Sequence, residues 1–178
     1  MRIWAFPWPK DALKETALEP TLRLALFEPD IPQNTAAVMR TCSCLGVACE
    51  VIEPCGFVFG GQHMRRAGMD YLDHVALTWH VDWHAFQAAY PGHRRILVTT
   101  KAAQPYMEHA FQRGDILIMG RESAGVPGFV HDAADARLTI PMAAGMRSLN
   151  MAVSAAMVAA EALRQLDAFP NSETNPHA

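Results

Sequence analysis

The sequence predicts an α/β fold with a mainly parallel β-sheet and helices on both faces. Short apolar segments alternate with helical segments along most of the 178 residues, as they do in βαβ units. Residues 96–98 and 116–119 are uniformly apolar, which is typical of strands covered on both faces. A third observation is a long helical segment with no charged residue between Met151 and Ala160. Such a helix is expected to be buried on more than one side.

The predicted domain begins with one strand, one loop and one helix. The strand covers residues 22–27, and the helix covers residues 35–45 after a turn-rich loop. Asn34 is expected to be the N-cap, because its side chain can accept hydrogen bonds from the free N–H groups of a first turn. Gly46 is expected to follow the last helical residue, where a left-handed conformation is common.

The remaining elements complete the sheet. A helix is predicted at residues 83–90, and five further apolar segments bounded by turn residues are predicted strands: residues 47–52, 75–78, 96–100, 116–119 and 138–140. Pro141 ends the last strand, because proline cannot donate to a ladder. Ser148 or Asn150 then caps the long helix. One face of this helix is expected to meet the sheet, and another a second subunit.

The bulk composition suits one soluble domain. The chain is 51% hydrophobic and 19% charged, with a formal net charge of -3. A nucleic acid partner would therefore need a local basic patch. No apolar run approaches the ~20 residues of a membrane span, and the first ten residues are a poor signal peptide. We expect a cytoplasmic protein with a domain at residues 21–168, an N-terminal extension (1–20) and a disordered tail (169–178).

Several common cofactor motifs are absent. The four cysteines form no C-x-x-C pair, so reduced, packed thiols and no metal site are expected. No G-x-G-x-x-G follows the first strand, which disfavours an ordinary dinucleotide site. Residues 120–125 have the spacing of a P-loop start, but Val126 and Pro127 replace its Lys and Ser/Thr. His80 and His84 lack the glutamate of a zinc-protease motif and are expected at a solvated helix start.

Three loops that follow predicted strands carry the candidate functional residues. The first holds Asn34 and leads to Arg40, the second (120–127) holds Glu122, and the third (141–150) precedes the long helix. In a parallel sheet all three project from one edge, where open α/β sheets bind ligands. That edge is expected to carry a basic patch made of Arg40, Arg121 and Arg147, with Arg65, Arg66 and Lys101 on neighbouring loops.

These motifs resemble the SPOUT superfamily of S-adenosylmethionine-dependent RNA methyltransferases. The likeness covers about residues 22–167 and rests on residues 28–40, 120–127 and 140–150. Residues 65–71 also resemble the subfamily of small bacterial 2′-O-methyltransferases that act on the wobble nucleotide (cytidine or uridine 34) of tRNA. The resemblance implies a C-terminal trefoil knot, a homodimer formed through the C-terminal helix, S-adenosyl-L-methionine as cofactor, tRNA as substrate and no metal.

The resemblance also assigns residue roles. It implies that the cofactor contacts Val98, Thr99, Gly120, Ile140, Met142 and Ser148. The catalytic residues that it implies are Arg40, Glu122, Ser148 and Asn150. The implied RNA-binding residues are Asn34, Arg40, Arg65, Arg66 and Arg147. One position departs from the family pattern, because Ala36 stands where a glycine is usual.

The implied reaction is in-line transfer of a sulfonium methyl group to a ribose 2′-hydroxyl. Arg40 would face the methyl group across the dimer interface, and family accounts make it the base. A guanidinium keeps its charge at ordinary pH, so we expect Arg40 to orient the hydroxyl or a phosphate and to stabilise developing alkoxide. Three alternatives stay open: another RNA target such as ribosomal RNA, a catalytically silent relative that binds RNA or cofactor, and a flavodoxin-like nucleotide-binding module.

Overall fold

The computed structural model describes residues 19–58 and 75–170. Its centre is a seven-stranded sheet in the order β3-β2-β1-β6-β4-β7-β5, and every strand pair in this described sheet is parallel. The predicted α/β class with a mainly parallel sheet is therefore confirmed. The strands are β1 (Leu22–Phe27), β2 (Ala48–Ile52), β3 (Leu77–His80), β4 (Arg95–Val98), β5 (Gln104–Pro105), β6 (Asp115–Met119) and β7 (Ala136–Thr139).

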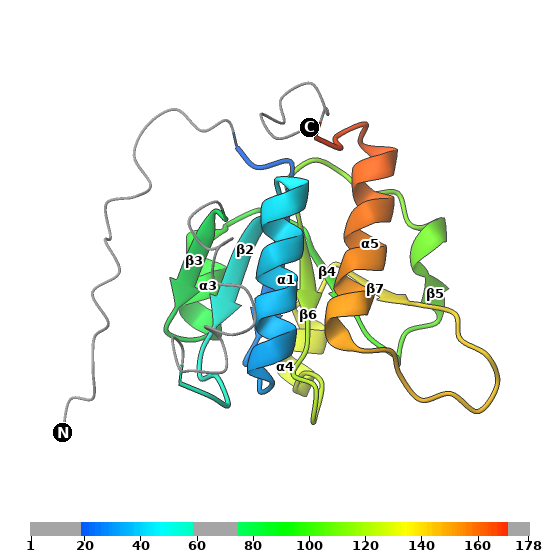
Figure 1. Cartoon of the computed structure of the whole chain (residues 1–178), viewed down its shortest axis with the longest axis horizontal. Helices are drawn as coiled ribbons and strands as arrows, with labels where there is room; N and C mark the ends of the chain where they lie inside the picture. Colours follow the sequence, from blue (N-terminus) through cyan, green and yellow to red (C-terminus); the bar gives the residue numbers. More distant parts are fainter. Residues whose placement is uncertain (1–18, 59–74, 171–178) are drawn as a thin grey trace.

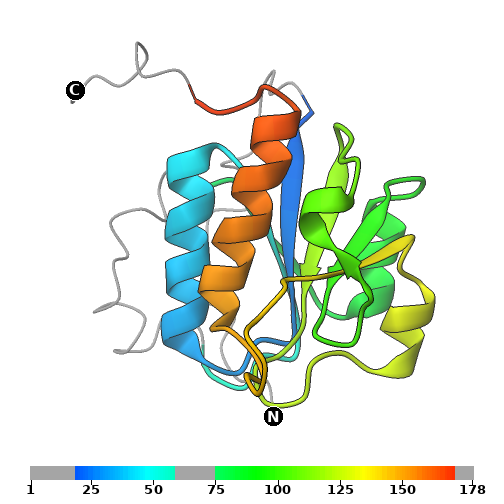
Figure 2. The same cartoon turned by 90° about the vertical axis from the view of Figure 1, so that its right-hand side faces the viewer.

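Helices cover both faces of the sheet. Helices α1 (Pro32–Leu45) and α5 (Met151–Gln165) lie side by side on one face (Figures 1 and 2). Helices α3 (Trp83–Ala89) and α4 (Gly128–Asp132) pack on the other. A short 3₁₀ helix (Tyr106–Glu108) follows β5.

The strands bury alternate side chains in two separate cores. In β1, Leu24 and Leu26 pack under α1 and α5, whereas Ala25 and Phe27 pack under α3 and α4. Strands β2 and β6 are buried at every position. Because neighbouring side chains of a strand point to opposite faces, two helical layers require apolar residues at both. This requirement explains the uniformly apolar run in β6.

Helix α1 begins earlier than the sequence analysis predicts. Its first residue is Pro32 and its N-cap is Ile31, with no capping side chain, so the prediction of Asn34 as N-cap is wrong. Proline fixes φ near the helical value and needs no hydrogen bond in a first turn, so it starts the helix without a polar cap. Asn34 is thereby released for contacts outside the helix. Gly46 ends α1 in a left-handed conformation (φ 65°), as predicted.

Helix α5 resolves the choice between two capping residues. Asn150 is its N-cap, and its side-chain oxygen accepts from the backbone N–H groups of Ala152 (2.8 Å) and Val153 (3.3 Å). The side of α5 that faces the sheet is lined by small and medium apolar residues, namely Met151, Ala155, Val158, Ala159 and Ala162. On the opposite side of α5, Val153 is 49% exposed, and Leu149, which precedes the helix, is 41% exposed. Of the two contacts expected for this helix, the structure of one chain shows the contact with the sheet, and the contact with a second subunit stays a prediction.

Some boundaries and small elements differ from the predictions. β3 begins two residues later than predicted, and β4 ends at Val98 instead of residue 100. Helix α4 and strand β5 have no counterpart among the predicted elements, because each is too short to show a period. In α1, Cys42 is buried and Cys44 is exposed, and all four cysteines are free thiols. No helix in the described ranges is both long and apolar enough to cross a membrane.

A charged cluster is buried away from the candidate loops. The Glu50 side chain is fully buried and accepts a hydrogen bond from Arg23 Nη1 (2.8 Å). His80 ends β3 and is buried, so its expected place at a solvated helix start is wrong. Its Nε2 lies 2.9 Å from the other Glu50 oxygen. The Arg23 guanidinium also stacks 4.4 Å from the Tyr90 ring centroid, and burial, followed by the charge of Glu50, raises the pKa of Tyr90 to about 12. These contacts compensate for burying the carboxylate.

Replacing Glu50 with Ala should therefore destabilise the protein strongly. The change leaves Arg23 and His80 without their shared acceptor, and breaking a buried pair from one side costs about 3–5 kcal/mol. Chemical denaturation would measure the free energy of unfolding. Arg164→Ala is the control, because Arg164 is 67% exposed in its pair with Glu161 and exposed pairs contribute little to stability. Equal losses in the two variants would contradict this account of the cluster.

Candidate active site

One cavity of about 570 Å³ opens at the carboxyl ends of the central strands. Its lining comes mainly from the loops after β4, β6 and β7 and from the start of α5. Among the lining residues are many that the sequence analysis singles out: Asn34, Val98, Thr99, Lys101, Gly120, Arg121, Glu122, Ile140, Met142, Arg147, Ser148 and Asn150. The three loops therefore meet at one edge of the sheet, as their positions after parallel strands predict.

A hydrogen-bonded chain joins the three loops. Asn150 Nδ2 donates to Asn34 Oδ1 (2.9 Å), and Asn34 Nδ2 donates to Glu122 Oε1 (2.9 Å). The other Glu122 oxygen accepts from the backbone N–H of Asp30 (3.1 Å). The carboxamide of Asn34 serves both partners at once, because it carries a donor and an acceptor. This double contact is the role that Asn34 takes in place of capping α1.

The loop after β6 is a tight hairpin. Arg121 and Gly125 exchange two backbone hydrogen bonds, of 3.0 and 2.8 Å. A Cβ on Gly120 would lie 2.7 Å from the carbonyl carbon of Gly125, so Gly120 permits the close approach of the two sides. The hairpin tip presents Glu122 and exposed Ser123 beside the loop after β1.

The two loops also exchange charged contacts. The Arg121 guanidinium binds the Glu28 carboxylate. The Asp30 carboxylate accepts from the backbone N–H groups of Glu122 (3.2 Å) and Ser123 (3.3 Å) and from the Ser123 hydroxyl. Sequence reasoning assigned no role to Asp30. Its contact with the hairpin depends on β1 lying next to β6, and the strand order cannot be read from local patterns.

The electrostatics of the two carboxyl groups differ. The Glu122 side chain, together with the Ser123 donors, lowers the pKa of Asp30. Burial, followed by the neighbouring Asp30, raises the pKa of Glu122. On acidification the first proton of this pair therefore goes to Glu122. A carboxyl group with a raised pKa on a cavity wall is a common feature of functional sites.

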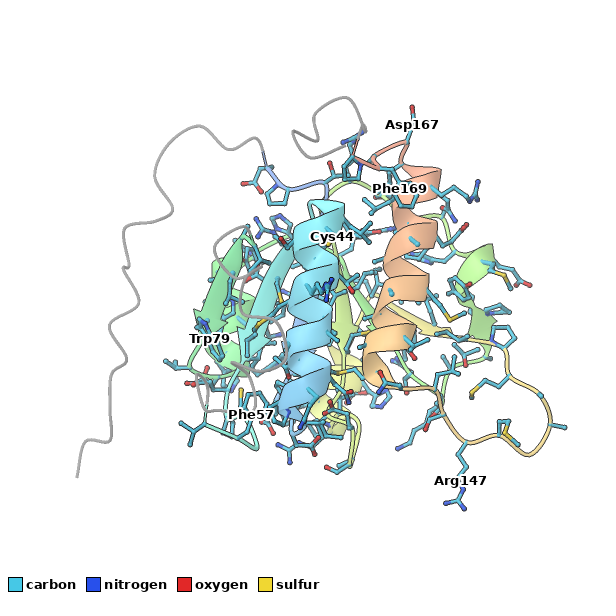
Figure 3. All side chains as sticks on the ribbon, in the orientation of Figure 1. Cys44, Phe57, Trp79, Arg147, Asp167 and Phe169 are labelled. Atoms are coloured by element: carbon cyan, nitrogen blue, oxygen red, sulfur yellow. The ribbon has the colours of Figure 1, made fainter. Side chains whose placement is uncertain are left out.

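Not every predicted site residue is seen to line the cavity in the described part of the chain. Arg40 is exposed on α1, six residues beyond Asn34, and is not among the described residues that line the cavity. Arg65 and Arg66 fall outside the described residues. Arg147 borders the cavity, and its side chain extends outward from its loop (Figure 3). Of the expected basic patch, Arg121 is paired with Glu28, while Lys101 and Arg147 are exposed.

The donor set offers little for a metal ion. Within residues 19–58 and 75–170, no cluster of three or more His, Cys, Asp or Glu side chains could hold one. The cavity combines apolar side chains such as Leu97 and Ile140 with a few polar groups. Its volume lies within the roughly 300–1,000 Å³ typical of small-molecule sites. The arrangement suits an organic ligand whose polar groups are bound by the loop backbones.

Comparisons with known proteins identify a family. Residues 21–160 match the model of the SpoU rRNA Methylase family. A protein of Beijerinckia indica, named tRNA (cytidine(34)-2'-O)-methyltransferase, is 55% identical over 87% of this chain and 98% of its own length. A protein of Ancylobacter novellus with the same name is 46% identical over 86% of this chain and 99% of its own.

A solved structure has the same fold. It is described as "Structural insights into the 2-OH methylation of C/U34 on tRNA", and it is 39% identical to this chain. It superposes with a TM-score of 0.80 over 84% of this chain and 98% of the other. The sequence and the fold therefore point to the same group of proteins.

Replacing Gly120 with Ala should destabilise the hairpin. The added methyl group would lie too close to the Gly125 backbone, which has no flexible side chain to move away, and overpacking of this kind costs about 1–3 kcal/mol. Gly128→Ala is the matched control, since a Cβ there has no neighbour within 4 Å. Thermal and urea denaturation of both variants measure the effect. A Gly120 variant as stable as the control would show that the hairpin is looser than described.

Proposed function

The chain belongs to the SpoU rRNA Methylase family, and from this premise we propose that it methylates tRNA. The reaction is transfer of a methyl group from S-adenosyl-L-methionine to the ribose 2′-hydroxyl of the wobble nucleotide, cytidine or uridine 34. Relatives named for this activity, at up to 55% identity over almost their whole length, support the substrate. The observation that carries the proposal is the series of hydrogen bonds from Asn150 through Asn34 to Glu122, three residues that line the same cavity.

The cavity fits the proposed cofactor in size and chemistry. Its apolar side chains suit a nucleoside, and the hairpin and loop backbones can bind polar groups at its edge. The residues proposed to hold the cofactor are Val98, Thr99, Gly120, Ile140, Met142 and Ser148, and all of them line the cavity. When bound, this cofactor supplies an already activated methyl group, so the reaction requires no metal.

The chain's own residues orient the acceptor. Glu122, Ser148 and Asn150 border the cavity, and we assign them to the placement of the reacting groups. Alignment alone can contribute roughly 7–11 kcal/mol to such a reaction. The proton of the 2′-hydroxyl leaves to a phosphate or to water. Arg40 orients the hydroxyl or an adjacent phosphate and stabilises the developing alkoxide, because its guanidinium cannot act as a base at ordinary pH.

A second copy of the chain is proposed to supply Arg40. Arg40 lies on the same helical layer as α5, away from its own chain's cavity. The N-termini of α1 and α5 are tied together by Asn34 and Asn150. Around them, Ile31, Leu149 and Val153 leave more than 40% of their surface exposed. An apolar surface of this kind beside two helices suits a symmetric interface, which would bring the partner's Arg40 to the cavity.

Four further parts of the proposal concern the whole chain. We propose that the segment from β7 to α5 forms the trefoil knot of the superfamily, since α5 returns from the loop after β7 to pack against β1 and β6. The methyltransferase domain is taken as residues 21–168. Arg65, Arg66 and Arg147 are proposed to bind RNA together with Asn34 and Arg40. The enzyme would act on tRNA in the cytoplasm.

Labelled methyl transfer to total tRNA from cells that lack the enzyme tests the activity. We expect incorporation at nucleotide 34, nearly lost in Arg40→Ala and reduced at least tenfold in Arg40→Lys, because lysine lacks the planar fork that binds two oxygens. Arg137→Ala, an exposed arginine on β7, is the control and should keep full activity. Methylation of ribosomal RNA alone would overturn the choice of substrate. Near-normal activity of Arg40→Lys would overturn the proposed role of Arg40.

A mixing experiment tests the shared site. Arg40→Ala and Glu122→Ala chains should each keep only a small residual activity alone. In a mixed dimer, one of the two sites combines Glu122 of the first chain with Arg40 of the second, so part of the activity should return after the subunits exchange. Mixing either variant with more of itself is the control. No recovery in a preparation shown to contain mixed dimers would place Arg40 and Glu122 in the same chain's site.

A further inference from the structure

Asp30 does not line the cavity, but it contacts two residues that do. It is absent from the described residues that line the cavity, whereas its contacts Glu122 and Ser123 are among them. Its carboxylate is thus placed to affect the site through other residues. No role of Asp30 follows from the proposed chemistry itself.

Asp30 and Glu122 hold each other's backbone. The Asp30 carboxylate accepts from the N–H groups of Glu122 and Ser123, while the Glu122 carboxylate accepts from the N–H of Asp30. Without this exchange, the N–H groups of Asp30, Glu122 and Ser123 would lack these partners. Hydrogen bonds to an ionised acceptor are the stronger kind, so the exchange fixes the separation of the loops after β1 and β6.

The loop after β2 also packs against Asp30, on the side away from the hairpin. The Gly56 N–H donates to the Pro29 carbonyl (2.9 Å), and a Cβ on Gly56 would lie 2.6 Å from the Asp30 Cβ. The loop after β2 therefore packs directly against the Asp30 backbone. Asp30 has little room to retreat, so the position of its carboxylate is set before any ligand binds.

The Glu122 carboxylate links the position of Asp30 to the start of α5 through hydrogen bonds. Held at one oxygen by the Asp30 N–H, it accepts from Asn34 at the other, and Asn34 in turn accepts from Asn150 at the start of α5. A displaced hairpin tip would move Glu122 and loosen Asn34 and Asn150 together. Asp30 is the outermost carboxylate in this series of contacts.

We propose that Asp30 is a positioning residue for the methyl transfer: by binding the hairpin backbone it sets the Glu122 carboxylate and, through Asn34, the start of α5. The proposal rests on the proposed function and deepens it. Misplacement of reacting groups by about 1 Å can lower a rate roughly 100-fold. We therefore expect loss of the Asp30 carboxylate to lower kcat by about 10- to 100-fold, with a much smaller change in KM for tRNA.

The first experiment compares Asp30→Ala with Asp82→Ala. Asp82 also accepts from a backbone N–H, that of Ala85 (2.7 Å), but it caps α3 on the other face of the sheet. Both variants lose a carboxylate that binds backbone, so they should lose similar stability. Only Asp30→Ala should lose kcat, whereas Asp82→Ala should keep the wild-type value. Asp30→Asn, which keeps the size of the side chain, is assayed in the same way if the alanine variant does not fold.

The second experiment is a double-mutant cycle. If Asp30 acts through Glu122, the variant that lacks both carboxylates should be no slower than Glu122→Ala alone. Independent effects that multiply would overturn the proposal, as would equal kcat values for the Asp30→Ala and Asp82→Ala variants. An active wild type with an unaffected Asp30 variant refutes only the positioning role. A wild type that transfers no methyl group to tRNA refutes the proposed function and this inference together.

Discussion

The parallel pairing of β1 with β6 is the constraint on which the candidate site depends. The two strands are neighbours in register, with Leu26 beside Met119, so the loops that follow them leave the sheet at one level. Those loops carry Asp30 and Glu122, and each carboxylate binds the backbone of the other loop. The contact to Asn150 then ties in α5, which comes from much later in the chain. A different strand order would separate these residues whatever their local sequence.

Much of the fold follows from local patterns. β1 and the start of α3 lie where the apolar periodicity and the turn residues place them. Gly46 ends α1 because few other residues accept a left-handed backbone. The meeting of three loops at one edge could also be predicted, because it requires only that the strands are parallel. These features depend on short-range chemistry or on the class of sheet alone.

The sequence predictions fail where contacts between distant parts of the chain determine what a residue does. Asn34 has the chemistry of a cap, yet its amide bridges Glu122 and Asn150, and Pro32 begins the helix instead. Asp30 looks like an ordinary turn residue until β6 is known to lie beside β1. The sequence pattern of α5 marks it as apolar nearly all round, but which side meets the sheet depends on how the helix is rotated. None of these outcomes has a periodic signal, and each depends on a neighbour distant along the chain.

The strand β5 limits how copies of this protein can associate. It has only two residues, and Pro105 lacks an N–H group to offer a further strand. The β7 side of the sheet therefore ends in an edge too short and too poor in donors to template another chain. Short edges and proline are common protection against edge-to-edge aggregation. Growth of the sheet into a continuous ribbon of copies is therefore blocked at this border.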